Sequence, residues 1–515
     1  MELEMKVSID NKQAKKLLAK YKPYLSRNDI GKLFKLILER PNEDIYDITE
    51  DYIAKKYSID KITDLIEETQ KKQVSFKWIM QKLHISKSRF YFRLNYLKRY
   101  YIKRNIDLII QRSKITKRQR IPKDKFYINQ LLKRKDTQRY ILLNPGPVLT
   151  SPSVKNALVQ YDMCHRDKDF QDLLAKLKRQ CLLLFGADKK YRVLFISGSG
   201  TAGLEAALSS FIPEGKKVLV ASNGAFGERL SDILTLHRIP VVYRKYPWGK
   251  RLNIHDLEQH LEEDNDIYAI AVNHHETSVG LLNPIHTIGM LAKKYKKIFI
   301  IDAISSLGAE KINVIRDNID VCITSSNKCI HSVTGLSLVC AKQHLLDSLK
   351  EQRPRSYYLD VYKHYQYLEN LNQTPYTPNI TSFFALDAAV KELLEEGLEN
   401  RRKKYIRRNS LLKSELIRLG FSFFTDSGDE SHTILTVKVP EWLEYREFYN
   451  KVKSLGFLIY DCKPPLYGKY FQIANMGDLN EAMLYDFIFV VEKVLKEMNS
   501  GRKAKKKVLY NVIEI

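Results

Sequence analysis

The middle of the chain alternates between short apolar runs and longer stretches of mixed character. In most cases the stretch between two runs is long enough for a helix. Apolar runs separated in this way are typical of buried strands joined by crossover helices, which form a mostly parallel sheet. We therefore predict a large α/β domain over residues 139–384. Its six predicted strands cover residues 193–196, 217–220, 268–272, 298–301, 321–324 and 336–339.

The pattern changes after about residue 385. A long, highly charged helix is predicted over residues 385–419, followed by strands at 433–437 and 457–460 and a closing helix over 482–498. These elements indicate a separate small α/β domain over residues 385–500. Residues 501–515 form a basic tail that we expect to be frayed.

The net charge of +26 is concentrated in one block of the chain. Residues 71–140 carry 22 Lys and Arg against 3 Asp and Glu, whereas residues 1–70 are nearly balanced. No run reaches the roughly 18 apolar residues that a membrane-spanning helix needs, so we expect no such helix. Acidic residues near the N-terminus are untypical of a signal peptide and favour a cytoplasmic location. Because the six cysteines lack Cys-x-x-Cys spacing, we expect reduced thiols and no metal site.

The segment before the predicted sheet is predicted to be helical. Residues 1–70 contain short amphipathic helices without a pattern that indicates chemistry. Residues 71–138 begin with an apolar helix that ends at Leu83, a turn through His84 and Ile85, and a second helix capped by Ser86. This order is similar to the helix-turn-helix of bacterial DNA-binding proteins, although His84 stands where glycine is more usual.

Positive charge accompanies that pattern. The second helix would pack through Phe90, Leu94 and Leu97 and leave its lysines and arginines outward, and a basic run covers residues 112–120. Such side chains suit contacts with phosphates, so residues 76–120 are predicted to bind DNA, with RNA left open. The alternative is a solvated, lysine-rich helical linker.

Two polar residues follow neighbouring predicted strands. Asp302 ends the run at 298–301, and Lys328 comes shortly after the run at 321–324. Taken singly, the Asp is most often a helix cap and the lysine a solvated side chain, but groups that converge on one edge of such a sheet usually bind a ligand. A buried-edge lysine can lose its proton and react with an aldehyde, and an Asp can keep a pyridine nitrogen protonated. The pair favours a pyridoxal phosphate site.

A glycine-rich turn and an aromatic residue support this hypothesis. Residues 197–205 follow the first predicted strand and open a helix, whose unpaired N–H groups can bind a phosphate. Taken alone, the turn could equally be a plain strand-to-helix connection. Phe226, in a similar position after the next strand, could stack on a flat heterocycle.

Over residues 140–498 the chain resembles fold-type I pyridoxal phosphate enzymes of aminotransferase class V, and within that class the 2-aminoethylphosphonate–pyruvate transaminases. The combination of motifs is specific, because the Asp-Met-Cys-His-Arg and Ser-Asn-Lys-Cys-Ile blocks rarely coincide in other members of the class. The motifs that carry the resemblance cover residues 142–147, 161–166, 198–205, 222–227, 274–284, 301–306 and 325–330.

The resemblance implies a role for each residue on the cofactor side. Lys328 would bind the cofactor covalently and, once displaced by substrate, carry a proton between substrate and cofactor. Asp302 would pair with the pyridine N–H, and Phe226 would stack on the ring. Thr277 or Ser278 would lie near the ring hydroxyl. The phosphate would be held by Ser199, Gly200 and Thr201, with Thr381 from the neighbouring subunit of a homodimer.

The resemblance also implies a substrate side, where the sequence departs from the family. Gly146 and Pro147 would line the substrate together with Arg166. The family usually reads Phe-Arg-Ile-Gly-Asn-Ile-Gly near its C-terminus, with the arginine on the substrate acid, but here Gln472 takes the place of that arginine. The change removes charge-assisted hydrogen bonds of about 1.5–3 kcal/mol each. Either the substrate differs or another cation binds the acid. The candidate cations are Arg166, Lys463 and Arg355.

Three functions stay open on the sequence alone. The first is an aminotransferase that passes an amino group from 2-aminoethylphosphonate or a related small amine to pyruvate. The second is a DNA-binding transcription regulator whose pyridoxal phosphate domain senses a ligand, which the basic N-terminal pattern and the loss of arginine at Gln472 favour. The third treats the first 140 residues as a helical module that docks a partner protein.

Overall fold

The computed structural model describes residues 140–425 and 428–513, with side chains described as far as Asn499. These residues belong to one compact unit. The helices predicted in residues 1–70 and the helix-turn-helix-like pattern of residues 71–138 lie outside the described residues. Within the described ranges, no helix is both long enough and apolar enough to cross a membrane.

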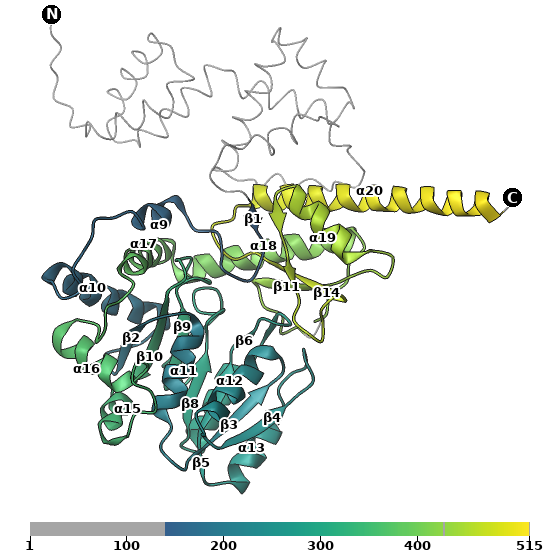
Figure 1. Cartoon of the computed structure of the whole chain (residues 1–515). Helices are drawn as coiled ribbons and strands as arrows, with labels where there is room; N and C mark the ends of the chain where they lie inside the picture. Colours follow the sequence, from purple (N-terminus) through teal and green to yellow (C-terminus); the bar gives the residue numbers. More distant parts are fainter. Residues whose placement is uncertain (1–139, 426–427, 514–515) are drawn as a thin grey trace, which may run out of the picture. The chain divides into compact units, whose positions relative to one another are not determined.

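A seven-stranded sheet organises residues 191–342 (Figure 1). Its strands lie in the order β2-β10-β9-β8-β5-β3-β4, and within this sheet β10 alone runs in the direction opposite to the other strands. The fold is therefore the mostly parallel α/β fold that the sequence predicts. The strands are β2 (Tyr191–Ser197), β3 (Lys217–Ser222), β4 (Val241–Lys245), β5 (Ile267–Asn273), β8 (Ile298–Asp302), β9 (Val321–Ser325) and β10 (Leu336–Lys342).

Each of the six predicted runs lies within one of these strands, whereas β4 was not predicted. β4 lies at the edge of the sheet beside β3, and none of its residues is fully buried. Central strands such as β9 are buried throughout and read as continuous apolar runs. A half-exposed edge strand lacks that run, which explains why the sequence pattern missed it.

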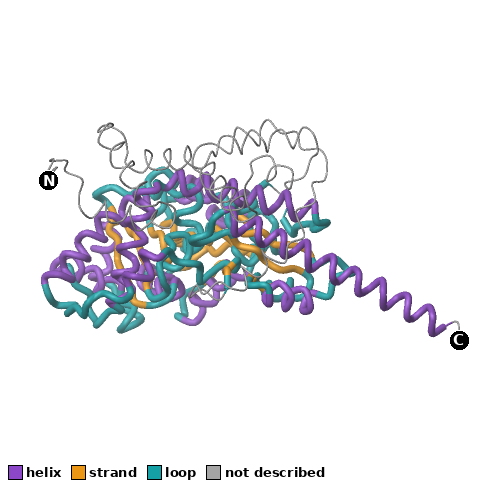
Figure 2. The backbone as a smooth tube through the Cα atoms, turned by 90° about the horizontal axis from the view of Figure 1, so that it is seen from above, coloured by secondary structure: helices purple, strands orange, loops and turns teal. Residues whose placement is uncertain are grey.

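Helices pack on the strands, and in Figure 2 they lie on both sides of the sheet. A large apolar core joins helices and sheet, in which Phe383 of one helix contacts the rings of Phe170 and Phe195 at 5.3 and 5.6 Å between centroids. The helices are α9 (Pro152–Ala157), α10 (Lys168–Phe185), α11 (Gly200–Phe211), α12 (Ala225–Leu236), α13 (Ile254–Glu263), α14 (Ile285–Lys294), α15 (Gln343–Ser348), α16 (Val361–Leu371) and α17 (Ile380–Glu396), with a short 3-10 helix at Leu349–Glu351.

A second core lies in the C-terminal part of the chain. It includes Phe448, Phe471 and Phe487, together with Ile141 and Leu143 from the start of the described chain. Here β11, β14 and β13 form an antiparallel sheet, and β1 pairs with β12 in parallel. The elements are β1 (Ile141–Leu142), α18 (Leu398–Arg418), β11 (Ile434–Lys438), α19 (Tyr445–Ser454), β12 (Phe457–Leu458), β13 (Tyr460–Asp461), β14 (Tyr470–Ala474) and α20 (Glu481–Ile513), and two small strands of the large region are β6 (His275–Glu276) and β7 (Leu281–Leu282).

Several predicted elements differ in this region. The single helix expected over 385–419 is two helices, because Gly397 has a φ of +82° and ends α17 before α18 begins. The strand expected at 457–460 is split between β12 and β13, which belong to different sheets. The closing helix continues to Ile513 through the basic tail, whose lysines and arginines are good helix formers. The predicted boundary at 384 falls inside α17, and the division into domains stays a prediction.

Candidate active site

The carboxyl ends of β8 and β9 bring two of the predicted residues to one edge of the sheet. The strands are parallel neighbours, and Asp302 at the end of β8 is paired in register with Ile323 of β9. Lys328 follows β9 in the turn that leads to β10. Because parallel strands end at the same edge, the carboxylate and the amine face a common region.

Lys328 is partly buried against the loop that precedes α9. Its Nζ donates a hydrogen bond to the carbonyl oxygen of Pro145. A Cβ added to Gly146 would lie 2.5 Å from this Nζ, so a larger residue here would displace the lysine side chain. Burial lowers the pKa of Lys328 to about 8, and the positive charges of Arg229 and Lys463 act in the same direction. Roughly a tenth of the amine is therefore uncharged at pH 7, far more than for an ordinary lysine, and this fraction can act as a nucleophile.

Asp302 is held by an arginine that the sequence motifs did not single out. The Asp302 side chain is 5% exposed, and one of its oxygens accepts a hydrogen bond from Arg229 at 2.8 Å. The other oxygen accepts from the backbone N–H of Ile304 at 2.9 Å. Arg229 lies three residues after Phe226 on α12, so both point from one face of that helix. That spacing is the signal that could have identified Arg229.

The start of α11 offers hydrogen-bond donors without a side-chain cap. Ser199 is the N-cap residue, and its side chain makes no capping hydrogen bond. A Cβ on Gly200 would lie 2.6 Å from Ile304, which places this turn against the loop after Asp302. The hydroxyl of Thr201 accepts a hydrogen bond from Arg229 at 3.2 Å. The open N–H groups and the positive end of the helix suit an anion such as a phosphate.

Phe226 is fixed through its backbone by a buried carboxylate. Glu276 accepts hydrogen bonds from the N–H groups of Phe226 and Gly227, at 3.1 and 2.9 Å, and from the side chain of Asn273 at 2.9 Å. Burial raises the pKa of Glu276, while these hydrogen bonds favour its charged form. The carboxylate therefore anchors the N-terminus of α12 and the aromatic ring that it carries. Glu276 lies within one of the sequence motifs, but no local pattern indicates this role.

Gln472 does not present its amide as a free group. It is 2% exposed on β14, and its Nε2 donates to the backbone oxygen of Thr277 at 2.6 Å and to Thr436 at 3.1 Å. The amide thereby joins the C-terminal sheet to the turn after β6. Thr277 is thus engaged through its backbone, and the neighbouring Ser278 hydroxyl bonds to Glu276.

Three predicted groups lie apart from this cluster in the described chain. Arg166 donates to the backbone oxygens of Thr374 and Pro375, at 2.7 and 3.1 Å, and not to a residue beside Lys328. Thr381 is exposed, and its hydroxyl donates to Asn379 at 2.8 Å. Arg355 donates to the carbonyl oxygen of Ile212 at 2.7 Å, at the far end of α11. Pro147 is exposed next to Gly146.

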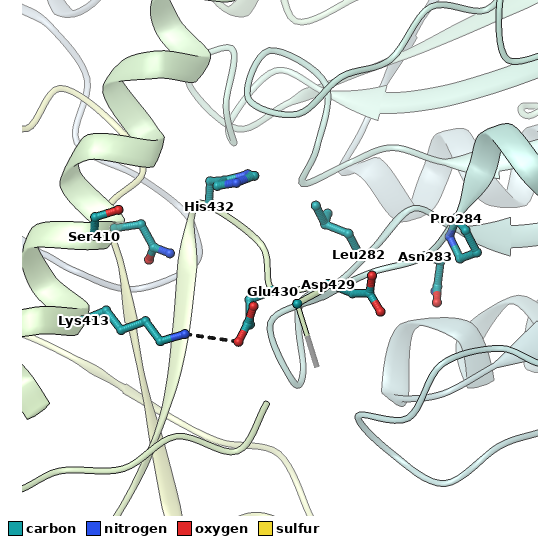
Figure 3. Close-up of a pocket in the computed structure, with 10 residues that line it drawn as sticks. Leu282, Asn283, Pro284, Ser410, Lys413, Asp429, Glu430 and His432 are labelled. Atoms are coloured by element: carbon teal, nitrogen blue, oxygen red, sulfur yellow. Dashed lines mark hydrogen bonds and ion pairs between the residues drawn. The ribbon is translucent and has the colours of Figure 1, made fainter. Parts of the chain in front are cut away.

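A pocket of about 390 Å³ lies elsewhere, between the loop at 282–284 and α18 (Figure 3). None of the predicted site residues lines it. Its charged groups are already paired, since Lys413 bonds Glu430 at 3.1 Å and His432 bonds Glu310 at 2.7 Å. The sheet edge with Lys328 and Asp302 is therefore the better candidate for the active site.

The groups at the sheet edge fit one kind of ligand. A nucleophilic amine, a carboxylate held by an arginine, an aromatic ring and an open helix N-terminus match a phosphorylated pyridine aldehyde, which needs a partner for each of its parts.

Comparisons with known proteins agree with this chemistry. The aminotransferase class V family profile matches residues 151–448. An uncharacterized aminotransferase of Methanocaldococcus jannaschii is 32% identical over 73% of this chain and 98% of its own length. The 2-aminoethylphosphonate–pyruvate transaminase of Lysinibacillus sphaericus is 34% identical over 70% of this chain and 99% of its own. A Bacillus cereus transaminase of the same name is 35% identical, with coverages of 70% and 99%.

Solved structures share the fold. The ureidoglycine–glyoxylate aminotransferase of Bacillus subtilis superimposes with a TM-score of 0.67 at 24% identity, over 71% of this chain and 95% of that one. The alanine–glyoxylate aminotransferase of Nostoc gives a TM-score of 0.66 at 24% identity, with coverages of 70% and 97%. At this level of identity the likeness concerns the architecture alone.

Proposed function

Because the chain belongs to the aminotransferase class V family and is a pyridoxal phosphate-dependent transaminase, we propose that it moves an amino group from 2-aminoethylphosphonate, or a related small amine, to pyruvate. The observation that carries the proposal is the partly buried Lys328 amine, with a pKa near 8, at the same sheet edge as Asp302. The choice of donor is supported by the relatives named 2-aminoethylphosphonate–pyruvate transaminase.

In this proposal each residue at the sheet edge has a separate role. Pyridoxal phosphate supplies an aldehyde and an electron-accepting ring when it is bound. Lys328 would form the covalent link and, once displaced by substrate, would move the proton at the reacting carbon. Asp302, aligned by Arg229, would keep the ring nitrogen protonated, and Phe226 would stack on the ring.

The remaining predicted residues complete the proposal. The phosphate would be bound by Ser199, Gly200 and Thr201 at the start of α11. Thr277 would lie near the ring hydroxyl, while Gly146 and Pro147 would line the substrate. We also infer a cytoplasmic homodimer in which Thr381, which is exposed here, serves the partner's site. Light scattering of the full chain would test the dimer, and mixing Thr381→Ala with Lys328→Ala subunits would test whether sites are shared.

The direct experiment follows amino transfer with purified full-length protein. Incubation with 2-aminoethylphosphonate, pyruvate and pyridoxal phosphate is expected to produce one alanine for each amine consumed. Omission of pyruvate should limit conversion to one turnover per bound cofactor, because the amino group then has no acceptor. Absence of alanine with every short amine tested would remove the proposed reaction.

A second function is a DNA-binding regulator that uses the aminotransferase-like domain as a sensor. Its support is the basic block of residues 71–140 and the loss of the family arginine at Gln472. This account predicts DNA binding that weakens steeply with salt and changes when the amine is added. Measurements of the dissociation constant over a range of salt concentrations, with and without amine, distinguish it from a transaminase whose N-terminal part has another role.

A further inference from the structure

A transaminase for acidic substrates needs a cation for the acid group, and Gln472 does not provide one. Its Nε2 is engaged by the backbone oxygen of Thr277 and by Thr436. Turning this buried amide toward a substrate would leave the Thr277 oxygen without its donor, and an unsatisfied buried group costs about 1–3 kcal/mol. Gln472 is therefore a structural tie between two parts of the fold.

Arg229 and the two arginines predicted from the sequence, Arg166 and Arg355, already bind other groups. Arg229 bonds both Asp302 and Thr201, so its charge serves the cofactor side. Arg166 is bound to the backbone oxygens of Thr374 and Pro375. Arg355 likewise bonds backbone oxygens at the far end of α11.

Lys463 differs from these arginines in position and in partners. It lies in the turn between β13 and β14, which leads to Gln472, and it is exposed. Its Nζ is 4.5 Å from the centre of the Phe226 ring. Its charge also acts on Lys328. Within the described residues its ammonium has no carboxylate partner, and a cation–π contact at an exposed site contributes only about 0.5–1 kcal/mol.

We propose that Lys463 binds the acid group of the substrate and so replaces the arginine that the family places at the position of Gln472. The inference rests on the proposed transaminase function and names the substrate class more closely: short amines and keto acids that end in an anion. A lysine ammonium is a point charge, whereas arginine is a planar fork that selects geometry. Lys463 should therefore discriminate by net charge, favouring a phosphonate over a carboxylate of equal length.

The test measures binding of an unreactive anion as well as turnover. Methylphosphonate is titrated into the holoenzyme, and its dissociation constant is read from the cofactor's visible absorbance. Lys463→Met is expected to weaken this binding about 10-fold or more, as expected for loss of a charge-assisted hydrogen bond. Lys463→Arg should retain most of it. Lys469→Met, an exposed lysine of the same turn, is the matched control and should change nothing.

Turnover of substrates with and without an acid group tests whether Lys463 acts on that group. In Lys463→Met the Michaelis constant for the aminophosphonate should rise, while slow turnover of ethylamine, which has no acid group, should stay the same. Unchanged methylphosphonate affinity in Lys463→Met would overturn the proposal, and so would an equal loss in Lys469→Met.

The two proposals fail in distinguishable ways. If methylphosphonate binding depends on Lys463 but 2-aminoethylphosphonate is not consumed, the anion site stands and the donor is wrong. If 2-aminoethylphosphonate is consumed equally well by Lys463→Met, the reaction stands and Lys463 is not its anion site.

Discussion

The edge of the large sheet and the turn before β14 contribute to one site in different ways. At the sheet edge, strand register fixes Asp302, and Lys328 follows the neighbouring strand. In the C-terminal region, Gln472 faces Thr277, and the adjacent turn brings Lys463 toward Phe226. The proposed cofactor chemistry thus depends on the sheet, whereas the cation proposed for the substrate acid lies in a turn of the C-terminal region.

The largest expected effect comes from removing the amine at the sheet edge. Lys328→Ala should abolish covalent attachment of the cofactor and lower turnover about 10³-fold, since a positioned proton-transfer group commonly contributes 10²–10⁴-fold. Borohydride reduction followed by peptide mapping measures the attachment. Lys469→Met should remain labelled at Lys328. Labelling of another lysine in the wild-type chain would show that the sheet edge does not hold the reactive amine.

Gly146→Ala is expected to have the next largest effect, because Gly146 lies directly beside the Lys328 side chain. Its Cβ would lie 2.5 Å from Lys328 Nζ, and its φ of +119° is strained for alanine. Displacing the amine by about 1 Å should lower kcat on the order of 10²-fold. Gly215→Ala is the control, since its backbone φ is also positive but its added Cβ meets no atom within 4 Å. Equal losses in both variants would indicate backbone strain alone.

Glu276→Ala tests whether the buried Glu276 carboxylate holds the N-terminus of α12 in place. Removing the acceptor leaves the N–H groups of Phe226 and Gly227 without their partner, so the free energy of unfolding should fall by about 3 kcal/mol. Urea denaturation of the cofactor-free protein measures it, and cofactor affinity should fall as well. The half-exposed Glu258, paired with Lys294, gives the control Glu258→Gln, which should change stability less.

The smallest expected effect is a shift in the pH at which Lys328 becomes reactive. Its pKa is about 8, so its labelling in the cofactor-free protein should rise through that pH. Arg229→Met removes a positive charge that disfavours the protonated amine, so the pKa and the labelling midpoint should move upward. Competitive acetylation followed by mass spectrometry measures the midpoint. Arg244→Met, whose partner is Asp256, should leave it in place.

The sequence allowed prediction of those parts that depend on continuous patterns. Buried strands have uninterrupted apolar runs, and strand-end polar residues converge in any parallel sheet, which made Asp302 and Lys328 predictable. The half-exposed β4 has no such run. The Gly397 break depends on one backbone conformation, which a charged helical pattern conceals. The contacts of Arg229 with Asp302, of Glu276 with Phe226 and of Gln472 with Thr277 join residues far apart in the chain, so no local pattern predicts these contacts.

The two-residue strand β1 positions the loop that contacts Lys328. Ile141 N–H bonds Gly456 and Leu143 N–H bonds Leu458, both at 2.8 Å, and the chain then runs directly to the Pro145 oxygen that receives the Lys328 hydrogen bond. β1 thus attaches the start of the described chain to the C-terminal core, so the position of the loop beside the amine depends on the packing of that core.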